Sequence, residues 1–196
     1  MPAITLDSNS VNLHLHELAR LMQQQQPDSF KCLIITDNDA ALTRRLTAAF
    51  GESVAMLQIA QRDWDFESPL LSGTIAQAVE EGDFDQLVLV ANSRGAPVDA
   101  QSKVREGEIP GGAASHGMHS RLLLGVRRQQ QLLQAAKARF IEQYRQLSEI
   151  PAVGRYIASR RLHLHGLFYI GESGLFLHYD RETETLRPLI NPLPQC

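Results

Sequence analysis

The sequence predicts an α/β protein with a central, mostly parallel sheet, flanking helices and a C-terminal antiparallel edge strand. Three observations support this fold class. In the first half of the chain, apolar segments typical of buried strands alternate with segments of helical periodicity. The segment QLVLVA, residues 86–91, is continuously apolar, as in strands that are covered on both faces. Near the C-terminus, the glycine-containing turn 171–174 separates two strand-like segments, which predicts an antiparallel pair.

The expected elements follow in chain order. Helices are predicted over residues 8–26, 40–50, 69–82 and 120–149, the last with a break near Gly125, and over a short segment that starts at Pro151. Strands are predicted over residues 30–36, 53–59, 86–91 and 162–169, with LFLHYD as the returning strand and RETETLRPL completing the pattern. Gly51 and Gly82 are expected to close two of the helices. The polar, glycine-rich segment 99–118 is expected to form a long loop or a lid.

Composition bounds the class of protein. The chain has 196 residues, 43% of them hydrophobic and 21% charged, and a net charge of −3, which is ordinary for a globular protein. Its two cysteines, Cys32 and Cys196, form no disulfide framework or metal motif, so we expect a reducing compartment, the cytoplasm. We expect no signal peptide and no membrane span. The organisation expected is an N-terminal helical arm over 1–28 and a single α/β domain over 29–196.

The C-terminal third carries the most specific pattern. The segment IEQYRQLSEIPAVGRYIASRRLHLHGLFYIGESGLFLHYD resembles the end of the beta-class carbonic anhydrases. In that family a helix with a Gln-x-x-x-Leu pattern leads to Pro-x-Val, a strand similar to Leu-x-Leu-His-Gly-Trp-x-Tyr, and a glycine turn. The matching residues here are Leu162, Leu164, His165, Gly166, Leu167 or Phe168, Tyr169 and Gly174. The resemblance extends over most of the chain in element order, and it implies an N-terminal helix that wraps a partner subunit.

The zinc motifs of the family are absent from this sequence. The family holds zinc through the Cys of a Cys-x-Asp-Ser-Arg motif after the first strand and a His-x-x-Cys motif after the third, which leaves one position for a reactive water. Alignment of the apolar segments puts Asp37 and Asp39 at the first Cys and the Asp. The second motif falls on Ala91 or Asn92 and on Arg94 or Gly95, and no cysteine occurs between residues 33 and 195. The resemblance therefore implies a fold that has lost its zinc.

Several interpretations of these residues stay open. Asp37 and Asp39 could be metal ligands, but Asp39 directly precedes a helix, and Asp is a good N-cap, so we expect a cap there. Arg94 could pair with either acid or bind a small anion such as bicarbonate. His116 and His119 are spaced to share a metal if their segment is helical, so that with Asp37 and Asp39 they could rebuild a site. A solvated surface loop is the simpler interpretation, and His165 is expected to pack structurally.

The function expected from the sequence is a non-catalytic binding, regulatory or scaffold homologue of the beta-class carbonic anhydrases, without a cofactor. The alternative is a zinc-dependent carbonate dehydratase or related lyase with a rebuilt metal site. A more distant alternative is nucleic-acid binding by the basic segment 120–161, against which stands the lack of interleaved aromatic residues. The expected partners are a second copy of the chain through the N-terminal helix, another protein, and bicarbonate or another small anion; no membrane is expected.

Overall fold

The computed structural model describes residues 8–25, 31–51, 54–60, 64–93 and 117–189, and every structural statement below concerns these residues. The helices are α1 (Ser8–Gln25), α2 (Ala40–Phe50), α3 (Pro69–Gly82), α4 (Gly117–Glu149) and α5 (Pro151–Ala158). The strands are β1 (Cys32–Asp37), β2 (Ala55–Ile59), β3 (Gln86–Asn92), β4 (His163–Ile170), β5 (Leu175–Asp180) and β6 (Thr185–Pro188). The predicted elements are confirmed: most of their ends agree, and the others shift by one or two residues, apart from the start of α4.

The strands form one six-stranded sheet in the order β2-β1-β3-β4-β5-β6. β1, β2, β3 and β4 are parallel, whereas β5 and β6 pair antiparallel at one edge. Parallel strands need crossover connections, and α2 and α3 supply them between β1, β2 and β3. The predicted fold class, a mostly parallel sheet with a C-terminal antiparallel edge, is therefore confirmed.

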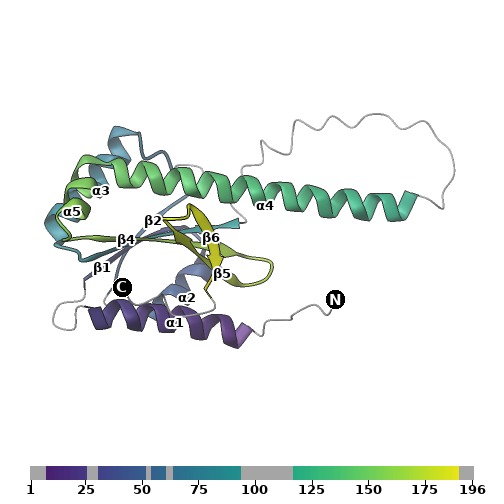
Figure 1. Cartoon of the computed structure of the whole chain (residues 1–196), viewed down its shortest axis with the longest axis horizontal. Coiled ribbons are helices and arrows are strands. Elements are labelled where there is room, and N and C mark those ends of the chain that lie inside the picture. The colour runs from purple at the N-terminus through teal and green to yellow at the C-terminus, as the bar shows by residue number, and fades with distance from the viewer. Residues whose placement is uncertain (1–7, 26–30, 52–53, 61–63, 94–116, 190–196) are drawn as a thin grey trace.

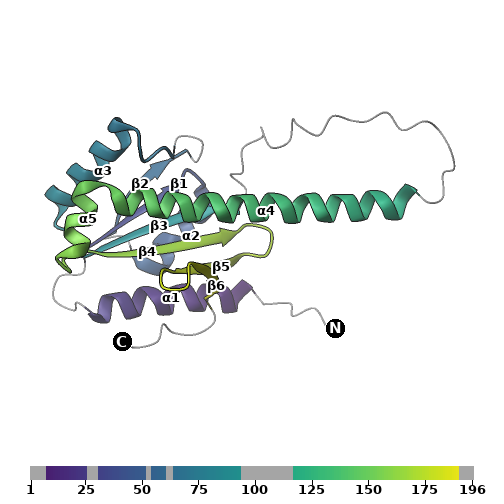
Figure 2. The ribbon, with the colours of Figure 1, turned by 45° about the horizontal axis from the view of Figure 1, so that its top comes forward.

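The sheet lies between two layers of helices (Figures 1 and 2). Alternate side chains of each strand point to opposite faces, so the core divides in two. One half contains odd-numbered residues of β1 and β3 and packs against α3, α4 and α5. The other half contains even-numbered residues of these strands and packs against α1 and α2. Helix α1 contributes Leu15, Leu18, Ala19 and Met22 to this second half.

An aromatic cluster joins α4 to the antiparallel part of the sheet. The rings of Tyr144 and Tyr179 have centroids 4.7 Å apart, and those of Phe140 and Phe168 are 5.6 Å apart. Gly166 lies beneath this cluster: a Cβ atom there would stand 2.9 Å from Tyr144 Cδ2 and 3.0 Å from Phe140 Cζ. The lack of a side chain at Gly166 therefore lets α4 approach β4 closely, which explains the His-Gly step noted in the sequence.

Helix α4 differs from its prediction at two points. It begins at Gly117 rather than Ser120, and it continues through Gly125 without the expected break. An isolated glycine inside a helix costs about 1 kcal/mol relative to alanine, which the packing of a long helix can outweigh. The N-terminal half of α4 extends beyond the sheet (Figures 1 and 2).

The end of α3 also differs from its prediction. Gly82 is still helical, and the residue in the left-handed conformation is Asp83, with φ of 48°.

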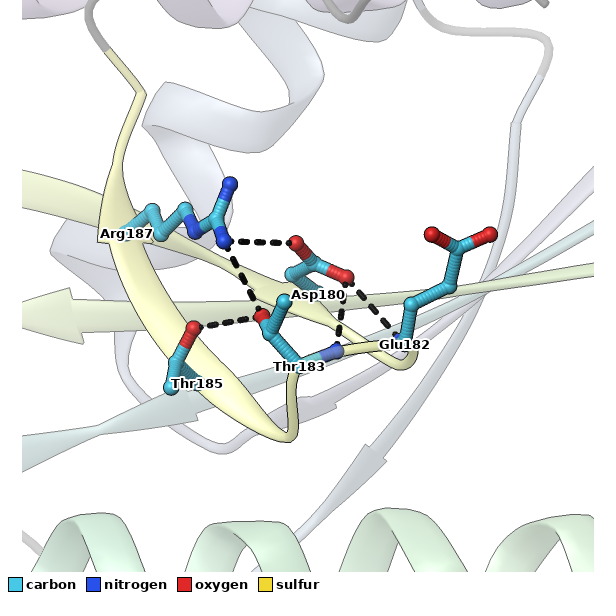
Figure 3. Close-up of polar contacts among 5 residues, drawn as sticks. All are labelled: Asp180, Glu182, Thr183, Thr185 and Arg187. Carbon is cyan, nitrogen blue, oxygen red and sulfur yellow. Dashed lines mark hydrogen bonds and ion pairs between the residues drawn. The ribbon is translucent and has the colours of Figure 1, made fainter.

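Polar contacts hold the turn between β5 and β6 (Figure 3). Asp180 Oδ1 accepts hydrogen bonds from the backbone amides of Glu182, at 3.0 Å, and Thr183, at 3.3 Å. Arg187 reaches back from β6, with Nη2 3.3 Å from Asp180 Oδ2 and 3.2 Å from Thr183 Oγ1. Hydrogen bonding stabilises the negative charge of Asp180 and lowers its pKa, chiefly through the side chain of Thr183 and less through the backbone amides. Contacts within the turn itself therefore stabilise the pairing of β5 with β6 at the edge of the sheet.

Candidate functional site

The candidate site lies where the chain direction across the sheet reverses. β1 is flanked by β2 on one side and by β3 on the other. The connection after β1 leads to β2, whereas the connection after β3 leads to β4 on the opposite side. In open parallel sheets, ligands bind in the crevice at the carboxyl ends of strands at such a point. The strands that meet here end at Asp37 and Asn92, two of the predicted site residues.

Asp39 is the N-cap of α2, as the sequence predicted. Its backbone is extended, and Oδ1 accepts hydrogen bonds from the amides of Ala41, at 2.8 Å, and Leu42, at 3.1 Å. These amides are among those that a helix leaves without a partner in its first turn. One carboxylate oxygen of Asp39 is thus committed to the helix start.

The second carboxylate oxygen of Asp39 contacts β3. Asn92 Nδ2 donates a hydrogen bond to Asp39 Oδ2 at 2.8 Å, and the Asn92 side chain is buried. This contact connects the carboxyl ends of β1 and β3 at the crevice. Both oxygens of Asp39 therefore accept hydrogen bonds from the protein itself.

A further polar contact, which the sequence analysis missed, lies beside Asn92. Ser93 Oγ donates to Glu172 Oε2 at 3.0 Å and accepts from the amide of Gly171 at 3.0 Å. Ser93 follows β3, and Glu172 lies in the turn between β4 and β5. The polar composition of the segments after two neighbouring strands was the available signal, but strand order was needed to pair them.

Asp37 and Ala91 lie toward the other face of the sheet. Ala91 is buried in the half of the core that faces α3, α4 and α5, whereas Asn92 turns toward Asp39. Strand alternation puts Asp37 on the same face as Leu33 and Ile35, which belong to that half of the core. The sheet thus divides the predicted site residues into Asp39 and Asn92 on one face and Asp37 and Ala91 on the other.

The remaining predicted site residues are only partly placed. Arg94 and His116 lie outside the described residues, so the pairing of Arg94 with an acid stays a prediction. His119 belongs to the first turn of α4, rather than to the expected surface loop. The spacing that a shared metal would need also involves His116, so a site shared by the two histidines stays a prediction.

The described residues at this edge do not fit a zinc ion. Zinc sites use thiolate, imidazole or carboxylate ligands with lone pairs directed at the metal. Here the Asp39 carboxylate is occupied by amide donors, and Asn92 presents an N–H group to it. Within the described part of the chain, no three His, Cys, Asp or Glu side chains are grouped so that they could hold a metal.

Cys32 is remote from this crevice. It is the first residue of β1, at the opposite end of the strand from Asp37. Burial raises the pKa of its thiol to about 12, which keeps the group protonated at neutral pH. Cys32 therefore packs as a small apolar residue in the core half that contains α1 and α2.

A second polar cluster lies away from the carboxyl ends of the strands. His165 Nε2 donates to Gln86 Oε1 at 2.9 Å, and the rings of His165 and His178 have centroids 6.4 Å apart. Burial, followed by the neighbouring His178 and His163, lowers the pKa of His165 to about 4. Burial likewise lowers the pKa of His178, which Asp180 partly opposes. His165 is therefore a neutral, hydrogen-bonded residue of the packed sheet.

Comparison with solved structures finds a similar arrangement of strands and helices in beta-carbonic anhydrases. The beta-carbonic anhydrase CafA of Aspergillus fumigatus is similar with a TM-score of 0.54, over 89% of this chain and 91% of that chain, at 18% sequence identity. The chain has the fold of the beta-class carbonic anhydrases. The beta-carbonic anhydrase CcaA gives a TM-score of 0.52 at 14% identity, over 89% of this chain and 92% of that one. One of the tetrameric beta-carbonic anhydrases of Sordaria macrospora gives 0.50 at 17% identity, over 82% and 90%.

Comparison of the sequence with protein families and with curated proteins gives no match. Among the described residues, no helix has both the length and the apolar character needed to cross a membrane.

Proposed function

We propose that this chain is a non-catalytic homologue of the beta-class carbonic anhydrases that acts as a binding, regulatory or scaffold protein. The observation that carries the proposal is that both carboxylate oxygens of Asp39 accept hydrogen bonds from the protein. One of its oxygens caps α2, and the other accepts a hydrogen bond from Asn92 across the crevice. In the family resemblance, Asp39 stands in the motif that supplies a zinc ligand.

The chemistry of the side chains supports a loss of the zinc site. When bound, zinc in this family would ionise a water molecule for attack on carbon dioxide. The sequence has no cysteine between residues 33 and 195, so two of the family's usual ligands have no counterpart. A carboxylate that accepts several amide hydrogen bonds is stabilised without a metal. The crevice would then hold β1, α2 and β3 together and leave Arg94 as a candidate for a small anion such as bicarbonate.

The alternative function is a carbonic anhydrase with a rebuilt site. It is favoured by the coverage of 91% of the CafA chain by the fold match and by the helical position of His119. Such a site would need Asp37 or Asp39 together with His116 and His119. To ligate zinc, Asp39 would have to release hydrogen bonds to α2 or Asn92, so this alternative costs stability at the helix start.

Stopped-flow measurement of carbon dioxide hydration distinguishes these functions. We expect the purified chain, with or without one equivalent of zinc, to hydrate carbon dioxide no faster than the buffer. Zinc-dependent hydration that is lost in His119→Ala would contradict the proposal and support the rebuilt site. His163→Ala is the matched control, because His163 is exposed at the opposite end of the sheet and should leave any activity unchanged.

A further inference from the structure

A groove opens between α1 and α2, on the face of the sheet that carries Asp39 and Asn92. It has a volume of about 400 Å³, within the range of small-molecule sites. Its lining is made of two residues of α1 and five of α2: Leu15, His16, Ala41, Arg44, Arg45, Ala48 and Ala49. The three alanines leave room between the helices, because larger side chains at these positions would fill the space.

The polar part of the groove lining is basic. Arg44 and Arg45 come from α2 and His16 comes from α1, and the described lining contains no Asp or Glu. Guanidinium groups present several N–H donors in a planar fork that matches carboxylate and phosphate oxygens. The remaining lining is apolar, so the groove offers donors for an oxyanion beside a surface for an apolar group.

Both arginines are restrained by contacts within the chain. Arg44 Nε donates to the carbonyl oxygen of Ala40 at 3.2 Å. The guanidinium carbon of Arg45 lies 5.9 Å from the centroid of the Tyr169 ring, within the range of a cation–π contact. Restraint before binding lowers the conformational entropy lost when a ligand is held. The two cations are thus partly organised for an anion.

We propose that this groove binds a small organic anion, with a carboxylate or phosphate group at Arg44 and Arg45 and an apolar part against the alanines and Leu15. A bare inorganic ion would leave most of the apolar lining uncovered. This inference goes beyond the proposed function, because it depends neither on the crevice at Asp39 nor on whether the chain hydrates carbon dioxide.

The groove is close to the crevice through the first turn of α2. Ala41 lines the groove, and its backbone amide donates to Asp39. Tyr169, beneath Arg45, is opposite Asn92 in the pairing of β3 with β4. A ligand that bridges α1 and α2 would therefore hold the helix start in place, and binding should raise the melting temperature of the chain.

Isothermal titration calorimetry of the full chain with phenyl phosphate, benzoate and inorganic phosphate tests the proposal. We expect saturable one-to-one binding of phenyl phosphate or benzoate, and the tighter of the two identifies the oxyanion. Arg44→Gln and Arg45→Gln should each weaken that binding about tenfold, since each removes a charge-assisted donor. Arg145→Gln, which makes the same charge change on α4 at the opposite face, should bind like the wild type.

Two results would overturn the proposal. The first is the absence of saturable binding by all three probes, or binding that neither arginine variant on α2 weakens. The second is inorganic phosphate binding as tightly as phenyl phosphate, which would exclude an apolar contribution. Because Arg45 contacts Tyr169, the melting temperature of each variant is measured first, and Arg44→Gln provides an independent result if Arg45→Gln is unfolded.

Discussion

At the scale of single residues, Asp39 connects three elements of the sheet's carboxyl edge. It follows β1, caps α2 and accepts a hydrogen bond from Asn92 at the end of β3. The amides that it binds are otherwise left without partners in the first turn of α2, and Asn92 is buried. Removing the carboxylate therefore takes a hydrogen-bond acceptor from donors in two elements at once.

Replacement of Asp39 by alanine should destabilise the fold. We expect Asp39→Ala to lower the free energy of unfolding by about 2–3 kcal/mol, from loss of the N-cap and of the acceptor for Asn92. Asp39→Asn keeps a capping oxygen, so its loss should be about 1 kcal/mol. Urea denaturation followed by circular dichroism measures both. Equal stabilities of the two variants would show that the cap contributes nothing.

His165 predicts a dependence of stability on pH. Its pKa is lowered to about 4 in the folded chain from 6.5, because burial favours the neutral ring. Below pH 6.5 the unfolded chain takes up a proton that the folded chain does not, so stability is lost as the pH falls toward 4. The difference amounts to at most about 3 kcal/mol.

The measurement is the free energy of unfolding of wild type and His165→Gln between pH 7 and pH 4. Glutamine at position 165 can still bond to Gln86 but does not titrate in this range. We expect a shallower loss of stability in the variant, with the remaining slope partly due to His178, whose pKa is also lowered. Parallel curves for the two proteins would contradict the assignment to His165.

Of the contacts of Asp39, the sequence predicted the helix cap but not the hydrogen bond from Asn92. The cap could be foreseen because Asp39 directly precedes a segment of helical periodicity, and capping is a local interaction. The hydrogen bond from Asn92 and the contact of Ser93 with Glu172 depend on which strands are neighbours. Sequence proximity does not supply that information.

At the scale of elements, the close approach of α4 to β4 depends on Gly166. The ring atoms of Phe140 and Tyr144 and the Cβ of Tyr179 surround the position that a side chain would take. These groups belong to two elements, α4 and β5, and they are packed together, so none can move without displacing others. The glycine that marks the family resemblance is therefore explained by packing.

Alanine substitution at two glycines tests this packing. We expect Gly166→Ala to lower the free energy of unfolding by about 1–3 kcal/mol through overpacking. Gly73→Ala is the matched control, because Gly73 is exposed in α3 and a Cβ there meets nothing within 4 Å. That variant should be stabilised by up to about 1 kcal/mol through helix propensity. If the first substitution is as well tolerated as the second, α4 does not depend on Gly166.

The helices and strands were largely predictable because hydrophobic periodicity follows burial. The exceptions are Gly82 and Gly125, where residue type alone predicts the end of one helix and a break in another. Gly82 instead stays helical beside Phe84, and Gly125 is an exposed position within α4. Local propensity contributes about 1 kcal/mol at such a residue, which the packing of the same helix elsewhere can exceed.

At the scale of the whole molecule, we predict a dimer in which α1 exchanges between copies. In the single chain α1 packs on its own α2 and β5, and an exchange would form the same contacts between two chains. Sedimentation at micromolar concentration should therefore give a dimer. A monomeric wild-type chain would contradict the exchange.

The fold of this molecule is established independently of the chemistry at the carboxyl edge of its sheet. The arrangement of strands and helices is that of the beta-carbonic anhydrases, at sequence identities of 14–18%. Fold similarity does not carry the activity, which depends on the ligands at the site. The ligand set could be questioned from sequence because at most one of the three usual ligands has an oxygen substitute among the aligned residues. The role of Arg94 depends instead on contacts that no pattern reveals.

Elemental analysis of the chain, purified without chelator or affinity tag, tests whether the protein binds zinc. We expect zinc far below one equivalent per chain, because the carboxylate of Asp39 accepts hydrogen bonds from α2 and Asn92. About one zinc per chain, reduced in His119→Ala and retained in His163→Ala, would contradict this expectation and establish a rebuilt metal site.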